Sequence, residues 1–272
     1  MSAYSSSPLE IVASAWRHRA LIATLTGREV AGRYKGSMLG IVWAFLLPLL
    51  MLATYTFVFS VVFQARWQGQ SASRGEFALI LFAGLLVFNL FSECLNRAPS
   101  LILQNQSYVK KVVFPLEILP WVTLGAALFH TGISYLVWQL FALLVLGVPS
   151  WTVLLLPLQL LPVCVLTLGL SWFTAALGVY MRDLAQLVGV LLGILMFLSP
   201  LFYPLSILPP GYQALLAINP LAPAIEATRE VLIWSRVPAA PGYLLQLAVA
   251  LIVAWAGFAF FQRTRRGFAD VV

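Results

Sequence analysis

The feature that most constrains this sequence is a series of long stretches almost free of charged residues. A helix needs about 20 mainly apolar residues to cross the hydrocarbon core of a bilayer. Six stretches approach or exceed that length, and we expect each of them to form a transmembrane helix. They cover residues 38–63, 77–96, 116–146, 152–180, 184–203 and 243–261.

The composition supports a membrane rather than an aqueous environment. Charged residues make up 9% of the chain, against about a quarter in soluble domains. Backbone groups in hydrocarbon must bond within the protein, so only helices and closed barrels span a membrane. A barrel requires alternating segments of about ten residues, whereas these stretches are apolar on all sides. The sequence therefore predicts an all-α integral membrane protein.

The basic residues predict its orientation, because cytoplasmic loops are enriched in Lys and Arg. With the N-terminus in the cytoplasm, six spans place 12 of the 16 basic residues on the cytoplasmic side. The net charge of +7 is thus explained by topology, and no basic soluble domain suggests nucleic-acid binding. We expect both termini in the cytoplasm. The four basic residues on the other side are Arg66, Arg74, Arg229 and Arg236.

The segments outside the spans divide the chain into three parts. Residues 1–37 form a cytoplasmic N-terminal segment, residues 38–261 the six-span domain and residues 262–272 a cytoplasmic tail. Within the first part, residues 8–35 begin with Pro8, a favoured first helical residue, and carry apolar residues on one side followed by basic ones. This pattern predicts an amphipathic helix in the cytoplasmic interface; a disordered tail is the alternative.

The external segment, residues 204–241, is rich in proline and too broken for two further spans. We expect two short re-entrant helices, separated by Asn219 and Pro220, that dip into the outer interface. On the cytoplasmic side, residues 97–115 form a loop with an amphipathic middle, and residues 180–184 form a very short turn.

No catalytic or metal-binding pattern is present. His18 and His130 are far apart in sequence, and a structural hydrogen bond is the preferred interpretation of His130 within a span. The glycines at 27 and 32 are not followed by the Lys and Ser or Thr that a P-loop requires. We therefore expect no cofactor in this chain, and ATP with its magnesium would be used by a separate protein. Carboxylates are missing from mid-membrane positions, which weighs against ion-coupled transport.

Aromatic residues in the first, second and fifth spans are candidates for a transport path. Flat rings can pack on the C–H faces of sugars without fixed hydrogen bonds, although packing or lipid contact is the alternative for each ring. The fifth span also contains Gly189 and Gly193, a spacing that permits close helix approach within one chain or between two. The candidate path residues are Tyr55, Phe59, Phe88, Phe91, Phe197, Phe202 and Tyr203.

Four motifs resemble the permease subunits of type-2 ABC exporters, most closely the O-antigen and capsule polysaccharide branch. Residues 28–48, REVAGRYKGSMLGIVWAFLLP, resemble that family's approach to the first span. Residues 105–119 resemble its loop before span 3, and residues 179–187, VYMRDLAQL, its Arg-Asp turn before span 5. Residues 198–204 with Asn219-Pro220 resemble its external re-entrant region. The resemblance covers nearly the whole chain.

The resemblance implies a homodimeric channel in a bacterial inner membrane, paired with two copies of an ATPase subunit. The cargo would be a lipid-linked polysaccharide moving from cytoplasm to periplasm, with spans 1 and 5 lining its path. Arg28, Arg33 and Lys35 would attract the lipid's pyrophosphate, or serve only as topology determinants. The residues expected to contact the ATPase are Arg97, Tyr108, Lys110, Lys111, Arg182 and Asp183.

Three alternatives remain at this stage. A type-2 ABC permease could carry another cargo, such as teichoic acid, capsule or a drug. A membrane-bound lipid or sugar transferase would need clustered carboxylates or histidines at one interface, which the sequence lacks. A structural or assembly protein would not require the paired cytoplasmic segments or the broken external segment.

Overall fold

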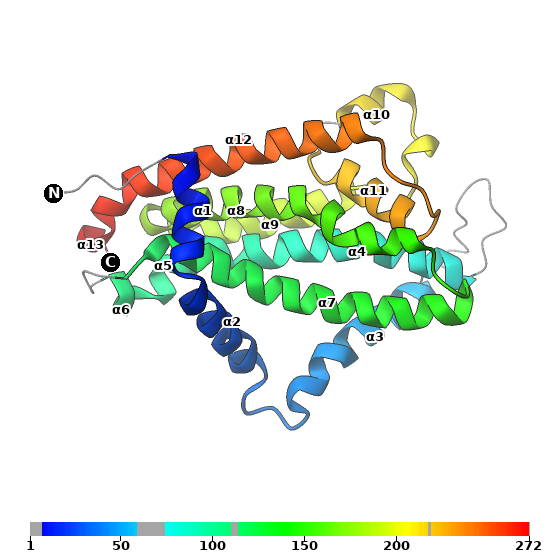
Figure 1. Ribbon diagram of the computed structural model, residues 1–272, viewed down its shortest axis with the longest axis horizontal. Helices are drawn as coiled ribbons and strands as arrows, with labels where there is room; N and C mark the ends of the chain where they lie inside the picture. The colour runs from blue at the N-terminus through cyan, green and yellow to red at the C-terminus, as the bar shows by residue number, and fades with distance from the viewer. Residues whose placement is uncertain (1–6, 59–73, 110–113, 217–218, 272) are drawn as a thin grey trace.

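The computed structural model describes residues 7–58, 74–109, 114–216 and 219–271, and this part of the chain contains helices and no strands (Figure 1). Four long helices run along the length of the molecule and form its body. They are α4 (Arg74–Arg97), α7 (Leu119–Val145), α8 (Leu156–Tyr180) and α12 (Ala240–Thr264).

Helix α4 is the centre of this body. In its most apolar stretch of 18 residues, 83% is buried inside the protein, which is more than in any other candidate span among the described residues. Two tryptophans bridge the central helices through their indole N–H groups. Trp138 on α7 donates to the carbonyl oxygen of Leu79 at 3.0 Å, and Trp172 on α8 donates to that of Glu117 at 3.0 Å. Both indoles are fully buried, so these bonds satisfy groups that water cannot reach.

Helices α8 and α12 approach each other most closely, because small residues meet where they cross. A Cβ atom at Gly257 would lie 2.0 Å from the carbonyl oxygen of Gly169, and one at Gly169 would lie 2.6 Å from the Cα of Ala254. Neither position accepts a side chain without moving a backbone. Small residues at such crossings are the usual basis of helix association in membranes.

In the part of the chain that the structure describes, five helical segments are long and apolar enough to cross a membrane. They agree with the first, second, third, fourth and sixth predicted spans, and residues 59–63 of the first lie outside the described residues. The fifth is shorter than predicted, since α9 (Leu184–Leu198) has 15 residues and ends before Pro200. The backbone of Ser199 is extended, because the proline that follows it makes helical geometry sterically unfavourable.

The N-terminal segment forms two helices instead of the single one predicted. Helix α1 (Pro8–Arg17) is separated from α2 (Arg19–Tyr34) by His18, whose backbone leaves helical geometry. On α1, Leu9, Val12 and Trp16 are exposed, as expected for an apolar face at an interface. Figure 1 shows α1 crossing the end of the bundle and α2 continuing outward to the turn before α3 (Trp43–Tyr55).

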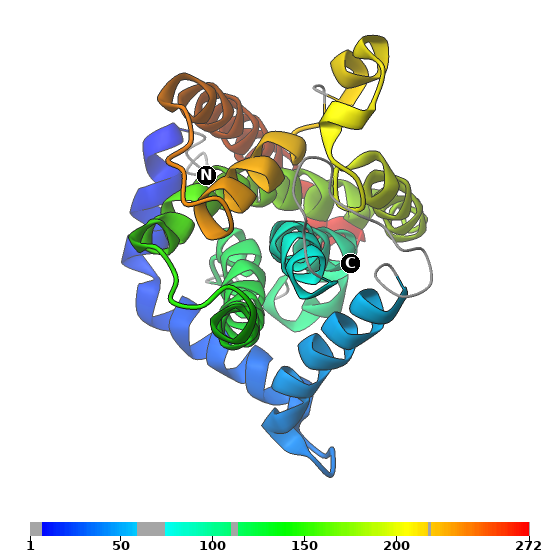
Figure 2. The same cartoon turned by 90° about the vertical axis from the view of Figure 1, so that its right-hand side faces the viewer.

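The external segment contains two short helices on either side of Asn219 and Pro220, as predicted. They are α10 (Pro210–Leu216) and α11 (Ala222–Leu232). Helix α10 projects from the body (Figure 2), whereas α11 packs into it through residues that include Ile225 and Val231. The apolar face of α11 is thus covered by protein.

The remaining elements are short. Among the described residues, four lie between α4 and α7, one before α3, one before α8, one before α10 and two at the C-terminal end. They are η3 (Ala98–Ser100), α5 (Leu101–Gln104), α6 (Gln106–Val109), η4 (Leu116–Ile118), η1 (Gly40–Val42), η5 (Trp151–Leu155), η6 (Leu205–Ile207), η7 (Arg265–Gly267) and α13 (Phe268–Val271).

Candidate functional site

A polar stripe runs along the half of α4 that leads to Arg97. Asn89, Ser92, Glu93, Asn96 and Arg97 are spaced by three and four residues, so they form a continuous stripe on the helix surface. Asn89 and Asn96 are exposed although the helix around them is the most buried of the spans. Polar residues at such a position usually face a cavity or the bundle interior.

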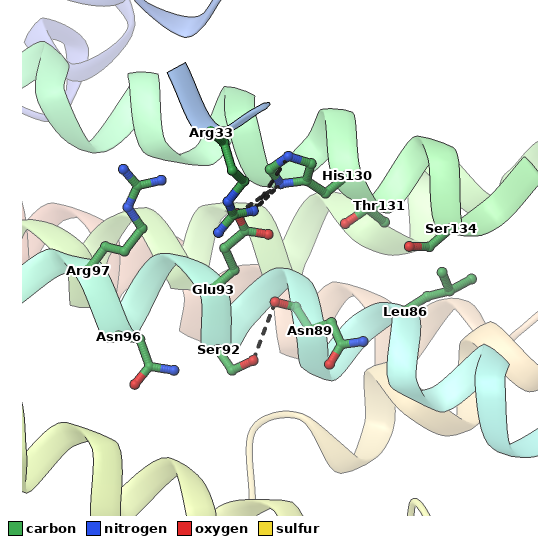
Figure 3. A pocket seen from close by; sticks show the side chains of 10 residues that line it. All are labelled: Arg33, Leu86, Asn89, Ser92, Glu93, Asn96, Arg97, His130, Thr131 and Ser134. Carbon is green, nitrogen blue, oxygen red and sulfur yellow. Dashed lines mark hydrogen bonds and ion pairs between the residues drawn. The ribbon is translucent and has the colours of Figure 1, made fainter. Parts of the chain in front are cut away.

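The stripe lines a cavity of about 380 Å³ to which α7 also contributes; in Figure 3 Glu93 points toward His130, whereas Asn89, Ser92 and Asn96 lie on the other side of α4. Helix α7 contributes His130, Thr131 and Ser134, and Arg33 reaches the cavity from α2. Its lining is thus mostly amides, hydroxyls and charged groups.

Three of these residues form a charged cluster on one side of the cavity. The Arg33 NH1 lies 2.7 Å from the Glu93 Oε1, and the His130 Nδ1 lies 2.8 Å from the same oxygen. The His130 Nδ1 is also 2.8 Å from the Arg33 NH1, so its role as donor or acceptor depends on the tautomer. The preferred interpretation of His130 as a structural hydrogen-bonding residue is confirmed. The cluster joins α2, α4 and α7.

A second ion pair repeats this connection one turn away. Arg97 on α4 pairs with Glu29 on α2. Glu29 precedes Arg33 by four residues, and Glu93 precedes Arg97 by four, so each helix presents one acid and one base to the other. We name this four-residue set, Glu29, Arg33, Glu93 and Arg97, the α2–α4 clamp. It balances the charge of both arginines that line the cavity.

Of the predicted headgroup residues, Arg33 is thus engaged in the clamp. Arg28 and Lys35 are exposed on α2 and in the turn after it. Arg28 lines a smaller cavity of about 220 Å³ together with Asn105 and Tyr108.

Where the structure describes them, the residues predicted to contact an ATPase lie at one end of the molecule. A Cβ atom at Gly178, near the end of α8, would lie 2.0 Å from the Pro99 carbonyl oxygen of η3. The turn with Arg182 and Asp183, which follows α8, therefore lies beside the segment after α4. Arg182 and Asp183 are exposed, and Tyr108 stacks on Phe114 with ring centroids 4.2 Å apart. The remaining two, Lys110 and Lys111, lie outside the described residues.

A buried joint holds this end together. The Glu117 Oε2 lies 2.6 Å from the NH1 of Arg265, which follows α12. The Glu117 Oε1 accepts a hydrogen bond from the buried hydroxyl of Ser14 on α1 at 3.2 Å. One carboxylate therefore links the N-terminal helix, the segment before α7 and the C-terminal end.

The predicted path aromatics do not share one surface. Phe197, Phe202 and Tyr203 lie together at the end of α9, where the Phe197 and Phe202 centroids are 5.9 Å apart and the Tyr203 hydroxyl donates to the Phe197 carbonyl at 3.0 Å. Phe88 and Phe91 instead lie in the core of the chain, 6% and 4% exposed. Tyr55 is half-buried, and Phe59 lies outside the described residues.

Arg229 is an important residue that sequence reasoning placed only among the external basic residues. Its side chain is fully buried. Its Nε donates to the Ile80 carbonyl at 3.1 Å, its NH2 to the Leu201 carbonyl at 2.9 Å and its NH1 to Glu226 at 3.0 Å. Burial lowers the pKa of Arg229 to about 10, so the guanidinium stays charged at neutral pH. The residue locks α11 to α4 and to the segment after α9.

Comparison with known proteins decides the family of this bundle. The profile of the ABC-2 type transporter family matches residues 20–233, which include nearly all of α2, the long helices α4, α7 and α8, the turn at Arg182 and the helices α10 and α11. The chain belongs to the ABC-2 type transporter family. This ABC-2 transporter chain is accordingly a multi-pass membrane protein and a transport subunit.

Individual relatives of the ABC-2 chain are similar over most of their length. It is 30% identical to the O-antigen export system permease protein RfbA of Myxococcus xanthus, over 97% of this chain and all of the relative. It is 24% identical to the RfbA protein of Klebsiella pneumoniae, over 93% of this chain and 95% of the relative. It is also 27% identical to the polysialic acid transport protein KpsM of Escherichia coli, over 80% of each chain.

Proposed function

We propose that this chain is the channel-forming permease of an ATP-driven exporter that moves lipid-linked, O-antigen-like polysaccharide from the cytoplasm to the periplasm. The observation that carries the proposal is the similarity, along essentially the whole chain, to proteins named as O-antigen export permeases. The polar cavity beside α4 supports it, because a long polar chain cannot cross hydrocarbon without a lined path.

The permease acts with a separate ATPase, present in two copies, that binds and hydrolyses ATP with magnesium. The surface for that subunit is the end of the bundle bearing Arg97, Tyr108, Arg182 and Asp183, together with Lys110 and Lys111. These residues come from two segments far apart in sequence, and the Glu117 joint connects their end of the bundle to α1 and α12. ATP-driven closure of the ATPase then pushes on a connected block rather than on separate loops.

The complete channel is a homodimer in the bacterial inner membrane, with both termini in the cytoplasm. The distribution of basic residues supports this orientation. We assign the second copy to α9, because small residues permit close helix approach and, among the described residues, no atom lies within 4 Å of a Cβ at Gly193. Arg28 and Lys35, which are exposed, attract the pyrophosphate of the lipid carrier at the cytoplasmic side, whereas Arg33 is paired with Glu93. Phe197, Phe202 and Tyr203 contact sugar rings.

Complementation tests this function. A bacterial strain that lacks its own O-antigen export permease receives this chain with its partner ATPase, and surface O-antigen is measured with an antibody. We expect surface O-antigen to be restored only when both proteins are present. Intracellular accumulation despite normal amounts of both proteins in the membrane would contradict the proposal.

Capsular polysaccharide is the second candidate cargo, because the relative named polysialic acid transport protein is similar over 80% of this chain. The same experiment in a strain that lacks its capsule export permease distinguishes the two cargoes. Restoration of the capsule without restoration of surface O-antigen would assign the chain to capsule export.

A further inference from the structure

Two side-chain amides on α4 have no hydrogen-bond partner among the residues that the structure describes. Among the described residues, neither Asn89 nor Asn96 forms a hydrogen bond through its side chain, and both are exposed. Two hydroxyls of the cavity lining are engaged locally: Ser92 donates to the Asn89 carbonyl on α4, and Thr131 donates to the Ala127 carbonyl on α7. The two amides are therefore the free hydrogen-bonding groups of the polar stripe.

The positions of these amides exclude lipid as their natural environment. They lie within a candidate membrane span, and an amide facing hydrocarbon without a partner is strongly unfavourable. Water, a polar ligand or another protein must therefore cover them. The cavity of about 380 Å³ provides the space for water and ligand. Helix α9 borders the stripe, since a Cβ at Gly189 would lie 3.9 Å from the Asn96 Oδ1.

The charges in the cavity indicate which kind of ligand fits. Arg33 and Arg97 are paired with Glu93 and Glu29 of the clamp, so the lining carries no unbalanced positive charge from its arginines. An anion would have to displace a carboxylate from a guanidinium. An uncharged ligand would leave both ion pairs intact. Amides both donate and accept hydrogen bonds, which matches hydroxyl groups that do the same.

We propose that Asn89 and Asn96 bind the hydroxyl groups of a saccharide segment in the cavity lined by α4 and α7, so that α4 contributes to the transport path. The proposal rests on the proposed function and adds a site to it. The two amides are seven residues apart, or about 10 Å along the helix, which lets one oligosaccharide contact both. The contacts are few and uncharged, so a sliding chain is held weakly at each step.

The first test removes the two amides and measures export. The double variant Asn89→Leu/Asn96→Leu keeps similar side-chain volume but cannot hydrogen bond. In the complemented strain, with equal amounts of permease and ATPase in the membrane, we expect surface polysaccharide to appear about tenfold more slowly. Gln139→Leu is the matched control, because it removes an amide from α7 outside the cavity lining, and we expect it to export normally. Normal export by the double variant would overturn the proposal.

The second test does not depend on export. Cysteine replaces Asn96 in a chain with Cys94→Ala and Cys164→Ala, and a hydrophilic maleimide is added to membranes from cells with and without polysaccharide synthesis. We expect labelling without polysaccharide and loss of labelling when polysaccharide fills the path. Ile252→Cys, exposed on α12, is the control and should not react with this reagent.

The labelling outcomes separate the competing environments. No reaction at Asn96→Cys in either membrane would mean that the stripe faces lipid. A disulfide between the Asn96→Cys positions of two copies, formed equally with and without polysaccharide, would mean that the stripe is a dimer contact. Either result would overturn the proposal. Failure of the unmodified chain to export polysaccharide would instead remove the proposed function, so the two failures are distinguishable.

Discussion

Arg229 shows how much a single side chain contributes to the external part of this fold. A buried guanidinium needs partners for its N–H groups, and here two carbonyls and one carboxylate supply them. Gly84 helps to make room, because a Cβ there would lie 3.0 Å from the Arg229 NH2. The residue fixes α11 against α4, which explains why this short helix packs into the body of the molecule.

We predict that Arg229→Met destabilises the protein by about 3 kcal/mol or more, because it leaves Glu226 and the Leu201 carbonyl without their donor. Thermal unfolding of the detergent-purified chain should shift to a lower temperature. Arg236→Met is the control, since Arg236 is exposed near the end of the same segment. An unchanged melting temperature for Arg229→Met would show that these bonds are not stabilising.

The sequence could not reveal this role, although it contained a hint. Glu226 and Arg229 are three residues apart, among the apolar residues of the segment. That spacing predicts a local ion pair. It does not reveal the carbonyl oxygens of Ile80 and Leu201, which belong to residues distant in sequence. The role of His130 was easier to predict, because a histidine within a span was expected to need a hydrogen-bond partner in the bundle.

At the level of elements, the α2–α4 clamp connects the N-terminal segment to the most buried helix. Its two ion pairs alternate in sign along both helices, so α2 has one preferred register on α4. The pairs differ in burial: the Arg33 side chain is 46% exposed and Glu93 is 17% exposed. Glu93 also bonds His130, so removing its charge affects two helices at once.

We predict that Glu93→Gln loosens α2 and raises amide hydrogen exchange within Arg19–Tyr34 by about tenfold, equivalent to about 1.4 kcal/mol in the opening of the helix. The neutral amide cannot form the ion pair with Arg33, but it keeps the size of the side chain. Mass spectrometry of the purified chain measures the exchange. Glu10→Gln, which breaks the exposed Arg17 pair on α1, should leave α2 unchanged. Equal exchange in wild type and Glu93→Gln would rule out a clamp.

Helix contacts were only partly predictable, because small residues are common in apolar helices. The pair Gly189 and Gly193 on α9 stood out in sequence, yet no atom lies within 4 Å of a Cβ at Gly193. The close contact instead joins Gly169 on α8 to Ala254 and Gly257 on α12, and these two helices are far apart in the sequence. Spacing identifies a face that permits close approach, whereas the partner of that face depends on the whole arrangement.

For the molecule as a whole, hydropathy and charge predicted the class correctly. The absence of charged residues over long stretches identified the membrane helices, because moving a charged side chain from water into lipid costs much free energy. The length of α9 was wrong by five residues, since apolarity continues past the proline that ends the helix. Phe88 and Phe91 were proposed for the path on residue type alone, and side-chain direction on α4 places them in the core while Asn89 and Asn96 are exposed.

The empty space at Gly193 gives a prediction about assembly. In a single chain, no atom lies within 4 Å of a Cβ at Gly193, so we expect Gly193→Phe to leave the fold unaffected. In the proposed homodimer, where α9 faces the second copy, overpacking should weaken association by about 1–3 kcal/mol. Native mass spectrometry in detergent measures the dimer fraction. Gly132→Phe on α7, which is also unobstructed, is the control. A dimer fraction equal to that of wild type would place the dimer contact elsewhere.

Transport in a defined system tests the central claim, that this chain is the membrane path for an exported polysaccharide. The permease and its ATPase are reconstituted in vesicles that carry labelled lipid-linked polysaccharide on the side of the ATPase, and a membrane-impermeant glycosidase on that side digests whatever remains. Our account predicts a protected fraction that grows with time only when ATP and both proteins are present. A protected fraction that does not respond to ATP, with an active ATPase bound to the permease, would contradict it.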